Sequence, residues 1–191
     1  MRKPPVVIVL AAGLGERFAA SGGTVHKLDA LLAGKRVMDH VLDAVRASGL
    51  PHHVVRPDAH EFAGAGMGDS IASGVSATPD ASGWLILPAD LPLIRSDTLL
   101  AIASAPPCGV TVPRYRGQRG HPVRFDALCG PDLLKLTGNS GAAQVLLAQE
   151  AIHSIAFVDV DDAGVVTDID TLEDLHQAET LLRERSKLTG R

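Results

Sequence analysis

The sequence predicts an α/β protein in which a mostly parallel sheet lies between two layers of helices. The apolar run at 6–10 is continuous and rich in β-branched residues, which is typical of a strand buried on both faces. Segments with helical spacing of apolar residues alternate with further short apolar runs. With 191 residues and 46% apolar composition the chain can bury a core of its own, so we expect a single domain over 1–191.

The predicted elements of the first half, about 1–95, follow one another in strand and helix order. Pro5 and a glycine-containing loop bound the strand at 6–10, and Gly49 ends a helix at 37–48. The rest of this half is predicted as a strand at 53–56, a helix beginning near Asp69 and ending near Val75, and a strand at 84–88 that runs into Ala89-Asp90.

The second half, about 96–191, continues the alternation. Its predicted elements are a helix with Ser96 as N-cap, a strand at 109–112, strand-like pieces with glycine-rich turns in 111–125 and 155–168, and a final helix capped by Thr171. Parallel strands joined by helices place their carboxyl ends on one edge of the sheet, where ligands bind. We therefore expect the functional residues just after positions 10, 56, 88 and 112.

Composition argues against several functions and locations. The net charge of −4, with both signs interspersed, gives no basic surface for nucleic acid. No stretch reaches the ~18 apolar residues of a membrane span. Arg2 and Lys3 precede an apolar run at 6–12 as in a secretory signal, but no cleavage site follows, so we expect a cytoplasmic protein. Cys108 and Cys129 lie outside any CxxC pattern and are expected to be reduced thiols.

The loop after the first strand is a candidate phosphate-binding loop. Gly13 and Gly15 permit backbone conformations closed to other residues, so the loop amides can surround phosphate oxygens. Arg17 adds a guanidinium, and Lys27 a mobile ammonium within reach of the same phosphates. A tight strand-to-helix connection is the simpler alternative. Phe18 occupies the place of the third glycine in the dinucleotide-binding fingerprint, and no Walker pattern is present, so both of these motifs are excluded.

Five short segments extend this observation over most of the chain. They are Leu10-Ala11-Ala12-Gly13-Leu14-Gly15-Glu16-Arg17-Phe18 with Lys27, Gly66-Met67-Gly68-Asp69-Ser70, Pro88-Ala89-Asp90-Leu91-Pro92, Arg116-Gly117-Gln118-Arg119-Gly120-His121-Pro122-Val123, and Asp168-Ile169-Asp170-Thr171. Together, from residue 6 to about 185, they resemble the MobA-like NTP transferase family, and most closely its molybdenum cofactor cytidylyltransferase branch.

The resemblance implies a Rossmann-like nucleotidyltransferase fold and a defined reaction. In that family the terminal phosphate of a pterin cofactor, molybdopterin, attacks the α-phosphate of CTP and releases pyrophosphate. Members with Leu-Ala-Ala-Gly tend to use CTP and members with Leu-Ala-Gly-Gly tend to use GTP, so Ala12 favours CTP. A molybdoenzyme is the expected client of such a product.

The site residues expected from the motifs fall into two sets. Nucleotide binding is assigned to the first loop and the segments that follow it: Leu10, Ala11, Ala12, Gly13, Gly15, Arg17, Lys27, Gly66, Ser70 and Asp90. Within this set Arg17, Lys27 and Asp90 are the expected catalytic residues. The segment similar to the one that borders the pterin acceptor in cytidylyltransferases implies acceptor contacts from Arg116, Gln118, Arg119, Gly120 and His121.

Nucleotidyl transfer concentrates negative charge on phosphate oxygens, for which Mg²⁺ is the natural counter-ion. Mg²⁺ takes one or two carboxylates together with phosphates and water. Asp90 follows a buried strand and Asp168 precedes a helix, so both are expected metal ligands. Each has a simpler alternative, a turn aspartate at Asp90 and an N-terminal capping segment at Asp168, in which Asp170 and Thr171 cap the helix.

Other interpretations also stay open. The acidic residues Asp159, Asp161 and Asp162 are explained by a solvated strand edge and turn, and Arg114, Arg116 and Arg119 by a solvated basic loop. Ser70 has an N-cap role as its alternative, and His121 a structural one.

Two segments depart from the family pattern. The stretch 18–26 is longer than usual and is interpreted as a mobile flap over the nucleotide. Gly138-Asn139-Ser140-Gly141-Ala142-Ala143 lacks the acid and the arginine that the family often has there. Two alternative functions follow: the same fold acting on another phosphate acceptor or with GTP, and a non-catalytic nucleotide-binding protein that assists molybdoenzyme maturation.

Overall fold

A mostly parallel sheet forms the centre of the computed structural model, which describes residues 3–56, 66–152 and 154–189. Within these ranges seven strands form one sheet in the order β4-β1-β5-β8-β6-β7, and β9 pairs with β6. The strands are β1 Val6–Leu10, β4 His52–Val55, β5 Gly83–Pro88, β6 Val110–Tyr115, β7 Gln118–Arg119, β8 Val123–Asp126 and β9 Ile155–Asp159. The predicted fold class, an α/β protein with a mostly parallel sheet, is confirmed.

Strand β1 is central and runs parallel to both neighbours, with Ile8 opposite His53 of β4 and Ile86 of β5. The other half of the sheet is mixed, because β8 is antiparallel to both β5 and β6. Arg116 and Gly117, with φ of 49° and 84°, form the two-residue turn between β6 and β7. Positive φ at both positions is the hairpin geometry that returns a strand antiparallel to the previous one.

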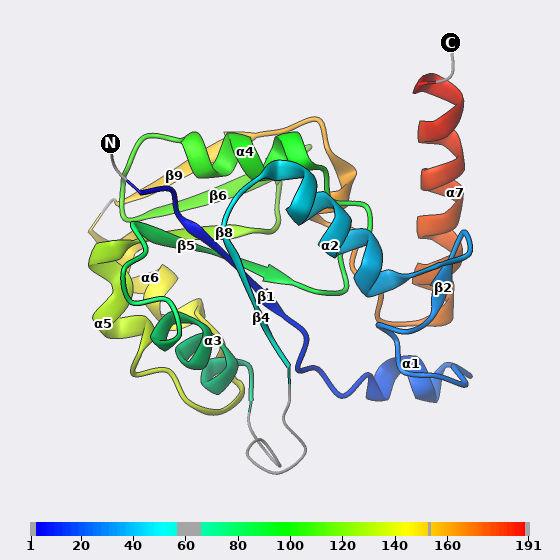
Figure 1. Ribbon diagram of the computed structural model, residues 1–191, viewed down its shortest axis with the longest axis horizontal. Helices are drawn as coiled ribbons and strands as arrows, with labels where there is room; N and C mark the ends of the chain where they lie inside the picture. Colours follow the sequence, from blue (N-terminus) through cyan, green and yellow to red (C-terminus); the bar gives the residue numbers. More distant parts are fainter. Residues whose placement is uncertain (1–2, 57–65, 153, 190–191) are drawn as a thin grey trace.

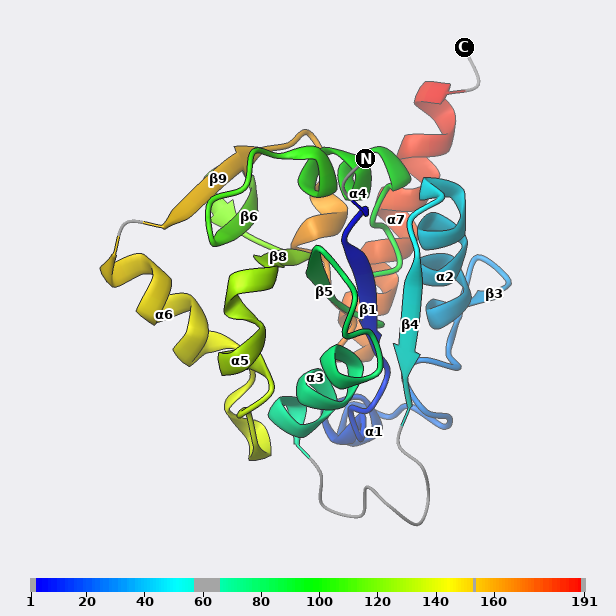
Figure 2. The same cartoon turned by 60° about the vertical axis from the view of Figure 1, so that its left-hand side comes forward.

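Helices cover both faces of the sheet (Figures 1 and 2). One face carries α2 Val37–Ser48, α4 Ser96–Ser104 and α7 Leu172–Thr189, and the other carries α3 Met67–Ser76, α5 Gly130–Leu133 and α6 Ala143–Ala151. Alternate residues of a strand point to opposite faces. Val7 and Val9 therefore join the core under α2, α4 and α7, whereas Ile8 joins the core under α3, α5 and α6.

Shorter elements complete the fold. They are α1 Glu16–Ala20, the hairpin β2 Leu31–Leu32 with β3 Lys35–Arg36, and the 3₁₀ turns η1 Ala127–Cys129, η2 Gly138–Ser140 and η3 Ala163–Val165. Both cysteines are unpaired, and no helix in the described ranges is long and apolar enough to cross a membrane.

Two predicted helix starts are wrong. Helix α3 begins at Met67 with Gly66 as its N-cap, two residues before the expected start, and its first amide is bonded by Asp69 rather than by Ser70. Ser70 lies inside the helix and donates its hydroxyl to the Gly66 carbonyl. Helix α4 has Arg95, not Ser96, as its N-cap residue.

The solvated interpretation of the acidic cluster is wrong for Asp162. This side chain is 5% exposed and accepts hydrogen bonds from Arg95 N, Thr98 Oγ1 and Gly164 N, at 2.7–3.0 Å. A buried carboxylate is tolerated when several donors satisfy it. Asp162 therefore joins the start of α4 to the loop that leads toward Asp168.

The stretch interpreted as a flap packs on the molecule at two points. Phe18 of α1 is 1% exposed and belongs to the core that includes α2 and α7. Ser21 Oγ accepts a hydrogen bond from the Leu172 amide at the start of α7. The first part of 18–26 is therefore anchored at Phe18 and Ser21.

Candidate active site

A cavity of about 720 Å³ opens at the carboxyl ends of β1 and β5. This volume lies within the range of small-molecule sites, and the position agrees with the ligand edge of a parallel sheet. The expected site residues that line it are Leu10, Ala12, Gly13, Gly15, Arg17, Lys27, Gly66, Ser70, Asp90, Gln118, Arg119, Gly120, His121 and Asp168. Ala11 and Arg116 are not among the lining residues. Positions beyond 56, expected to contribute after β4, fall outside the described residues until Gly66.

Two glycines shape the loop after β1 in different ways. Gly15 has a φ of 68°, in the left-handed region where a side chain is strained. Gly13 does not have a positive φ, so the expectation of a special backbone conformation is wrong there. A Cβ on Gly13 would have no atom within 4 Å, which leaves its cavity side open. Ala11, in contrast, packs in the core and donates its amide to the Val55 carbonyl.

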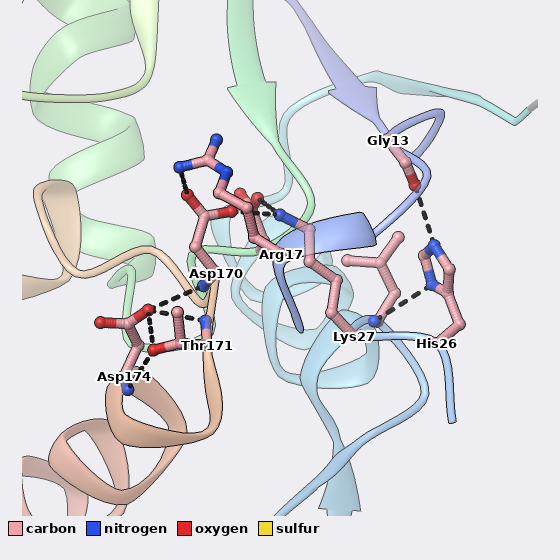
Figure 3. Close-up of polar contacts among 9 residues, drawn as sticks. Gly13, Arg17, His26, Lys27, Asp170, Thr171 and Asp174 are labelled. Carbon is pink, nitrogen blue, oxygen red and sulfur yellow. Dashed lines mark hydrogen bonds and ion pairs between the residues drawn. The ribbon is translucent and has the colours of Figure 1, made fainter. Parts of the chain in front are cut away.

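Four charged side chains form a chain of ion pairs at the cavity (Figure 3). Lys27 Nζ lies 2.6 Å from Asp90 Oδ2 and 2.8 Å from Asp170 Oδ1. Arg17 Nη1 lies 2.7 Å from Asp170 Oδ2. Burial disfavours the charged Lys27 ammonium, but the Asp90 and Asp170 carboxylates outweigh this and raise its pKa. The Lys27 ammonium is therefore charged, and both expected catalytic cations are held beside carboxylates.

Asp90 and the 168–170 segment are joined by a backbone hydrogen bond, because the Ile169 amide donates to the Asp90 carbonyl at 2.9 Å. Asp168 and Asp170, on either side of Ile169, both line the cavity together with Asp90. Partial desolvation, followed by the nearby Asp90 and Asp170 charges, raises the pKa of Asp168. Carboxylates from two distant parts of the chain, Asp90 and the 168–170 segment, thus line the same cavity as Lys27.

The residues at this point fit a hard divalent cation. Asp90 Oδ1 is buried without a hydrogen-bond partner in the described part of the chain, and such an orphaned oxygen is suited to a cation. The raised pKa of Asp168 reflects an unfavourable charge that a cation would relieve. Within the described residues no group of three or more His, Cys, Asp or Glu side chains is placed to hold a metal ion. A metal here therefore needs ligands beyond Asp90 and Asp168, as Mg²⁺ with phosphates and water provides.

Asp170 is a site residue, although its sequence pattern allows it to be a helix cap. The cap of α7 is formed instead by Thr171 and Asp174, as Figure 3 shows. Thr171 Oγ1 accepts from the Asp174 amide, and Asp174 Oδ2 accepts from the Thr171 amide, which is the reciprocal pattern of a capping box. The Asp170 amide also donates to Asp174 Oδ2 at 3.1 Å. This fixes the backbone of Asp170 and leaves its carboxylate for Lys27 and Arg17.

The segment 118–121 also lines the cavity. The Gly120 amide donates to Pro113 O, and a Cβ on Gly120 would lie 2.3 Å from Val165 O, so only glycine fits. The His121 amide donates to Val165 O at 2.8 Å. Burial lowers the pKa of the His121 imidazole despite the opposing charges of Asp90 and Asp168, so the ring is neutral at pH 7. Its Nδ1 is buried without a partner in the described residues.

The positive charge of the arginines near the 118–121 segment is partly neutralised. Arg114 makes two hydrogen bonds to Asp159, and Arg119 pairs with Glu150 at 2.9 Å. Both guanidinium groups also lie over the Phe157 ring, at 4.8 and 4.9 Å from its centroid. Arg116 lies over the Tyr115 ring instead and is not a lining residue.

Asp69 connects the start of α3 to the loop around Gly138, which departs from the family pattern. Its Oδ2 accepts from the amides of Gly66, at 2.8 Å, and Gly138, at 2.9 Å. A Cβ on Gly66 would lie 2.2 Å from the Gly138 backbone, so the loop around Gly138 packs directly on the start of α3. Asn139 of this loop lines the cavity. No sequence spacing indicates a contact between positions 69 residues apart.

The model of the MobA-like NTP transferase domain matches residues 7–153. The chain belongs to the MobA-like NTP transferase family. The expected resemblance is confirmed, and with it a nucleotidyltransferase type of activity. The purine catabolism protein PucB of Bacillus subtilis is 29% identical to this MobA-like chain over 197 residues, which cover 91% of this chain and 96% of PucB.

Solved structures agree with this assignment at the level of the fold. A nucleotidyl transfer enzyme from Methanothermobacter has a TM-score of 0.77 and 23% identity, over 95% of this chain and 99% of that one. Rv0371c of Mycobacterium tuberculosis in complex with manganese has a TM-score of 0.71 and 21% identity, over 94% and 100%. Molybdopterin-guanine dinucleotide biosynthesis protein A of Archaeoglobus fulgidus has a TM-score of 0.60 and 17% identity, over 94% and 99%.

Proposed function

We propose that this MobA-like protein transfers CMP from CTP to the terminal phosphate of a molybdopterin-like acceptor. An oxygen of the acceptor phosphate attacks the α-phosphorus of CTP and forms a new phosphoanhydride bond. The bond between the α-phosphorus and the oxygen that bridges to the β-phosphate breaks, and pyrophosphate leaves with that electron pair. The reaction needs no oxidant, reductant or further reactant.

A single observation carries the proposal: one cavity joins the phosphate loop and the Lys27–Asp170–Arg17 ion pairs to the 118–121 segment. Nucleotidyl transfer requires a triphosphate and an acceptor phosphate side by side, and positioning contributes much of the rate. A cavity lined both by these cations and by a separate polar segment meets this requirement.

Different residues of the chain are assigned to the phosphates and to the metal. Lys27 and Arg17 are assigned to the β- and γ-phosphates, where their fixed positive charge favours the leaving pyrophosphate. The amides of the loop at 13–15 are assigned to phosphate oxygens, beside the open side of Gly13. Asp90 and Asp168 would hold Mg²⁺, which supplies charge neutralisation at the reacting phosphates.

The acceptor is assigned to Gln118, Arg119, Gly120 and His121. The Archaeoglobus neighbour is a molybdopterin-guanine dinucleotide biosynthesis protein, which supports an acceptor of the molybdopterin class. His121 lines the cavity as a neutral ring with an unpartnered Nδ1, which supports a hydrogen bond to an acceptor group without added charge. Ala12 lines the cavity and, in the family's Leu-Ala-Ala-Gly form of the loop, supports CTP over GTP. A cytoplasmic location and a molybdoenzyme client fit the proposed reaction.

A second candidate is a role in purine catabolism, which the match to PucB over nearly the whole of both chains favours. In that case the fold and the nucleotide end are unchanged, and the acceptor or the enzyme served differs. Loss of growth on a purine as nitrogen source, after deletion of the gene, would support this role.

The test follows pyrophosphate release from each of CTP, GTP, ATP and UTP with Mg²⁺ and molybdopterin. We expect release with CTP, and only when molybdopterin is present. Release with another triphosphate would correct the nucleotide assignment, and release with another phosphate acceptor would correct the acceptor assignment. Triphosphate binding without any release would leave the non-catalytic accessory role. Asp132→Asn, which changes an exposed aspartate of α5 outside the cavity, serves as the matched control for the site variants below.

A further inference from the structure

We propose that His26 is a positioning residue that holds the phosphate loop in its binding shape. His26 Nε2 lies 2.8 Å from the Gly13 carbonyl oxygen, and the Leu28 amide lies 3.3 Å from His26 Nδ1 (Figure 3). The inference rests on the proposed function, since it assigns His26 to triphosphate binding. His26 itself does not line the cavity, so it acts through Gly13 and not by touching the substrate.

The two contacts select one form of the imidazole. A backbone N–H can only donate, so Nδ1 must accept the bond from Leu28. A carbonyl oxygen can only accept, so Nε2 must carry the proton and donate to Gly13. The neutral ring with its proton on Nε2 satisfies both partners at once.

The bond to Gly13 sets the direction of the next amide. In a trans peptide the C=O of one residue and the N–H of the following residue point in opposite directions. The Gly13 carbonyl is turned toward His26, outside the cavity, so the Leu14 N–H points the opposite way. Gly13 and Leu14 both line the cavity, and this orientation presents an amide donor to an anion in place of a repelling carbonyl.

The ring also packs on the second glycine of the loop. A Cβ on Gly15 would lie 3.4 Å from both Cδ2 and Nε2 of His26. The imidazole edge therefore lies against Gly15 while it bonds Gly13, so it contacts both glycines of the loop.

The backbone of His26 is itself fixed. Its carbonyl accepts hydrogen bonds from the Asp29 amide at 2.8 Å and the Ala30 amide at 3.1 Å. Lys27 follows directly and is held by Asp90 and Asp170. The 18–26 stretch is anchored at Phe18 and Ser21. It thus ends in His26, which connects the phosphate loop to Lys27.

Two substitutions separate the bonds. The amide of Gln can reach the position of imidazole Nε2 and donate to Gly13, so His26→Gln preserves the proposed interaction. Asn reaches only the position of Nδ1. His26→Asn can therefore accept the hydrogen bond from the Leu28 amide, but it loses the hydrogen bond to the Gly13 carbonyl. His176→Asn, at an exposed position of α7 outside the cavity, is the matched control.

The experiment measures the Kd of CTP with MgCl₂ by calorimetry, the KM values for CTP and molybdopterin, and the Tm of each variant. Loss of one hydrogen bond that orients the loop should raise the Kd and KM for CTP about tenfold in His26→Asn. We expect His26→Gln and His176→Asn to stay within about twofold of the wild type, with the KM for molybdopterin and the Tm unchanged in every variant.

The outcomes distinguish the two proposals. If the wild type binds CTP and His26→Asn binds it equally well, the role of His26 is contradicted and the proposed function is untouched. If His26→Gln binds CTP as weakly as His26→Asn does, the hydrogen bond to Gly13 does not support CTP binding and the inference fails. If the wild type binds none of the four triphosphates, the proposed function fails, and the assignment of His26 to triphosphate binding fails with it.

Discussion

The Lys27 ammonium lies 2.6 Å from Asp90 Oδ2, although 63 residues separate the two in the chain. The side chains are only 11% and 17% exposed, and Asp170 accepts a second bond from the same ammonium. The residue assigned to phosphate binding and the residue assigned to the metal are therefore a single electrostatic unit. A change in either one alters the environment of the other.

Replacing Lys27 by Met should destabilise the protein by about 2 kcal/mol, because Asp90 would lose its counter-ion and Asp170 would keep only Arg17. The folded-state pKa of Lys27 lies above its ordinary value of 10.5, so the stabilisation is complete below pH 10.5 and is lost as the pH rises through the folded pKa. Urea unfolding of wild type and variant from pH 7 to 11 measures this. A stability difference that narrows between pH 7 and 9 would contradict the account.

Replacing Asp168 by Asn should raise the Tm at pH 7 in the absence of divalent metal, by about 1–2 °C. The pKa of Asp168 is raised in the folded protein, so its charge opposes folding above the unfolded pKa near 3.8 and has no effect well below it. The two melting temperatures should therefore converge near pH 3. Adding Mg²⁺ should raise the Tm of the wild type and not that of the variant. A lower Tm for the variant at pH 7 without metal would show that Asp168 is structural.

Replacing Asp162 by Ala should lower the free energy of unfolding by about 3 kcal/mol. The change removes three hydrogen bonds and leaves the Arg95 amide and the Thr98 hydroxyl without their acceptor. Asp161→Ala changes an exposed neighbour and should cost less than about 0.5 kcal/mol. Denaturant unfolding measures the free energy of unfolding of both variants. Equal losses would mean that the contacts of Asp162 are not the source of its effect.

Replacing Asp69 by Ala should loosen the loop at 138–141 and cost about 1–2 kcal/mol, because one carboxylate oxygen bonds both Gly66 N and Gly138 N. Hydrogen exchange at the Gly138 amide should accelerate, and Asp69→Asn, which keeps an acceptor oxygen, should give a smaller change. Unchanged exchange at Gly138 in Asp69→Ala would contradict the contact.

The sequence predicts the buried parts of the fold well. The strands β1 and β5 and the helix α2 have continuous or helix-spaced apolar residues, which depend only on near neighbours. The antiparallel insertion of β8 between β5 and β6 is not visible in such patterns. The Arg116-Gly117 turn reverses the chain after β6, and the type of this turn depends on backbone angles that the sequence does not reveal.

The candidate site is predictable where a motif carries it and not where a distant contact does. Motifs indicate Lys27 and Asp90, and both line the cavity. The local Asp-x-Asp-Thr pattern favours a helix cap at Asp170 and does not reveal its contact with Lys27, 143 residues away. The signal for His26 is its place beside Lys27 at the end of an unusually long segment.

CTP labelled at either the α- or the γ-phosphate, incubated with Mg²⁺ and molybdopterin, tests the proposed transfer of CMP. We expect the α-label to enter the pterin product and the γ-label to leave as pyrophosphate. We also expect Asp90→Asn to lower the rate by about 100-fold or more, while Asp132→Asn does not. Appearance of the α-label only as free CMP or CDP, or full transfer by Asp90→Asn, would overturn the proposed function.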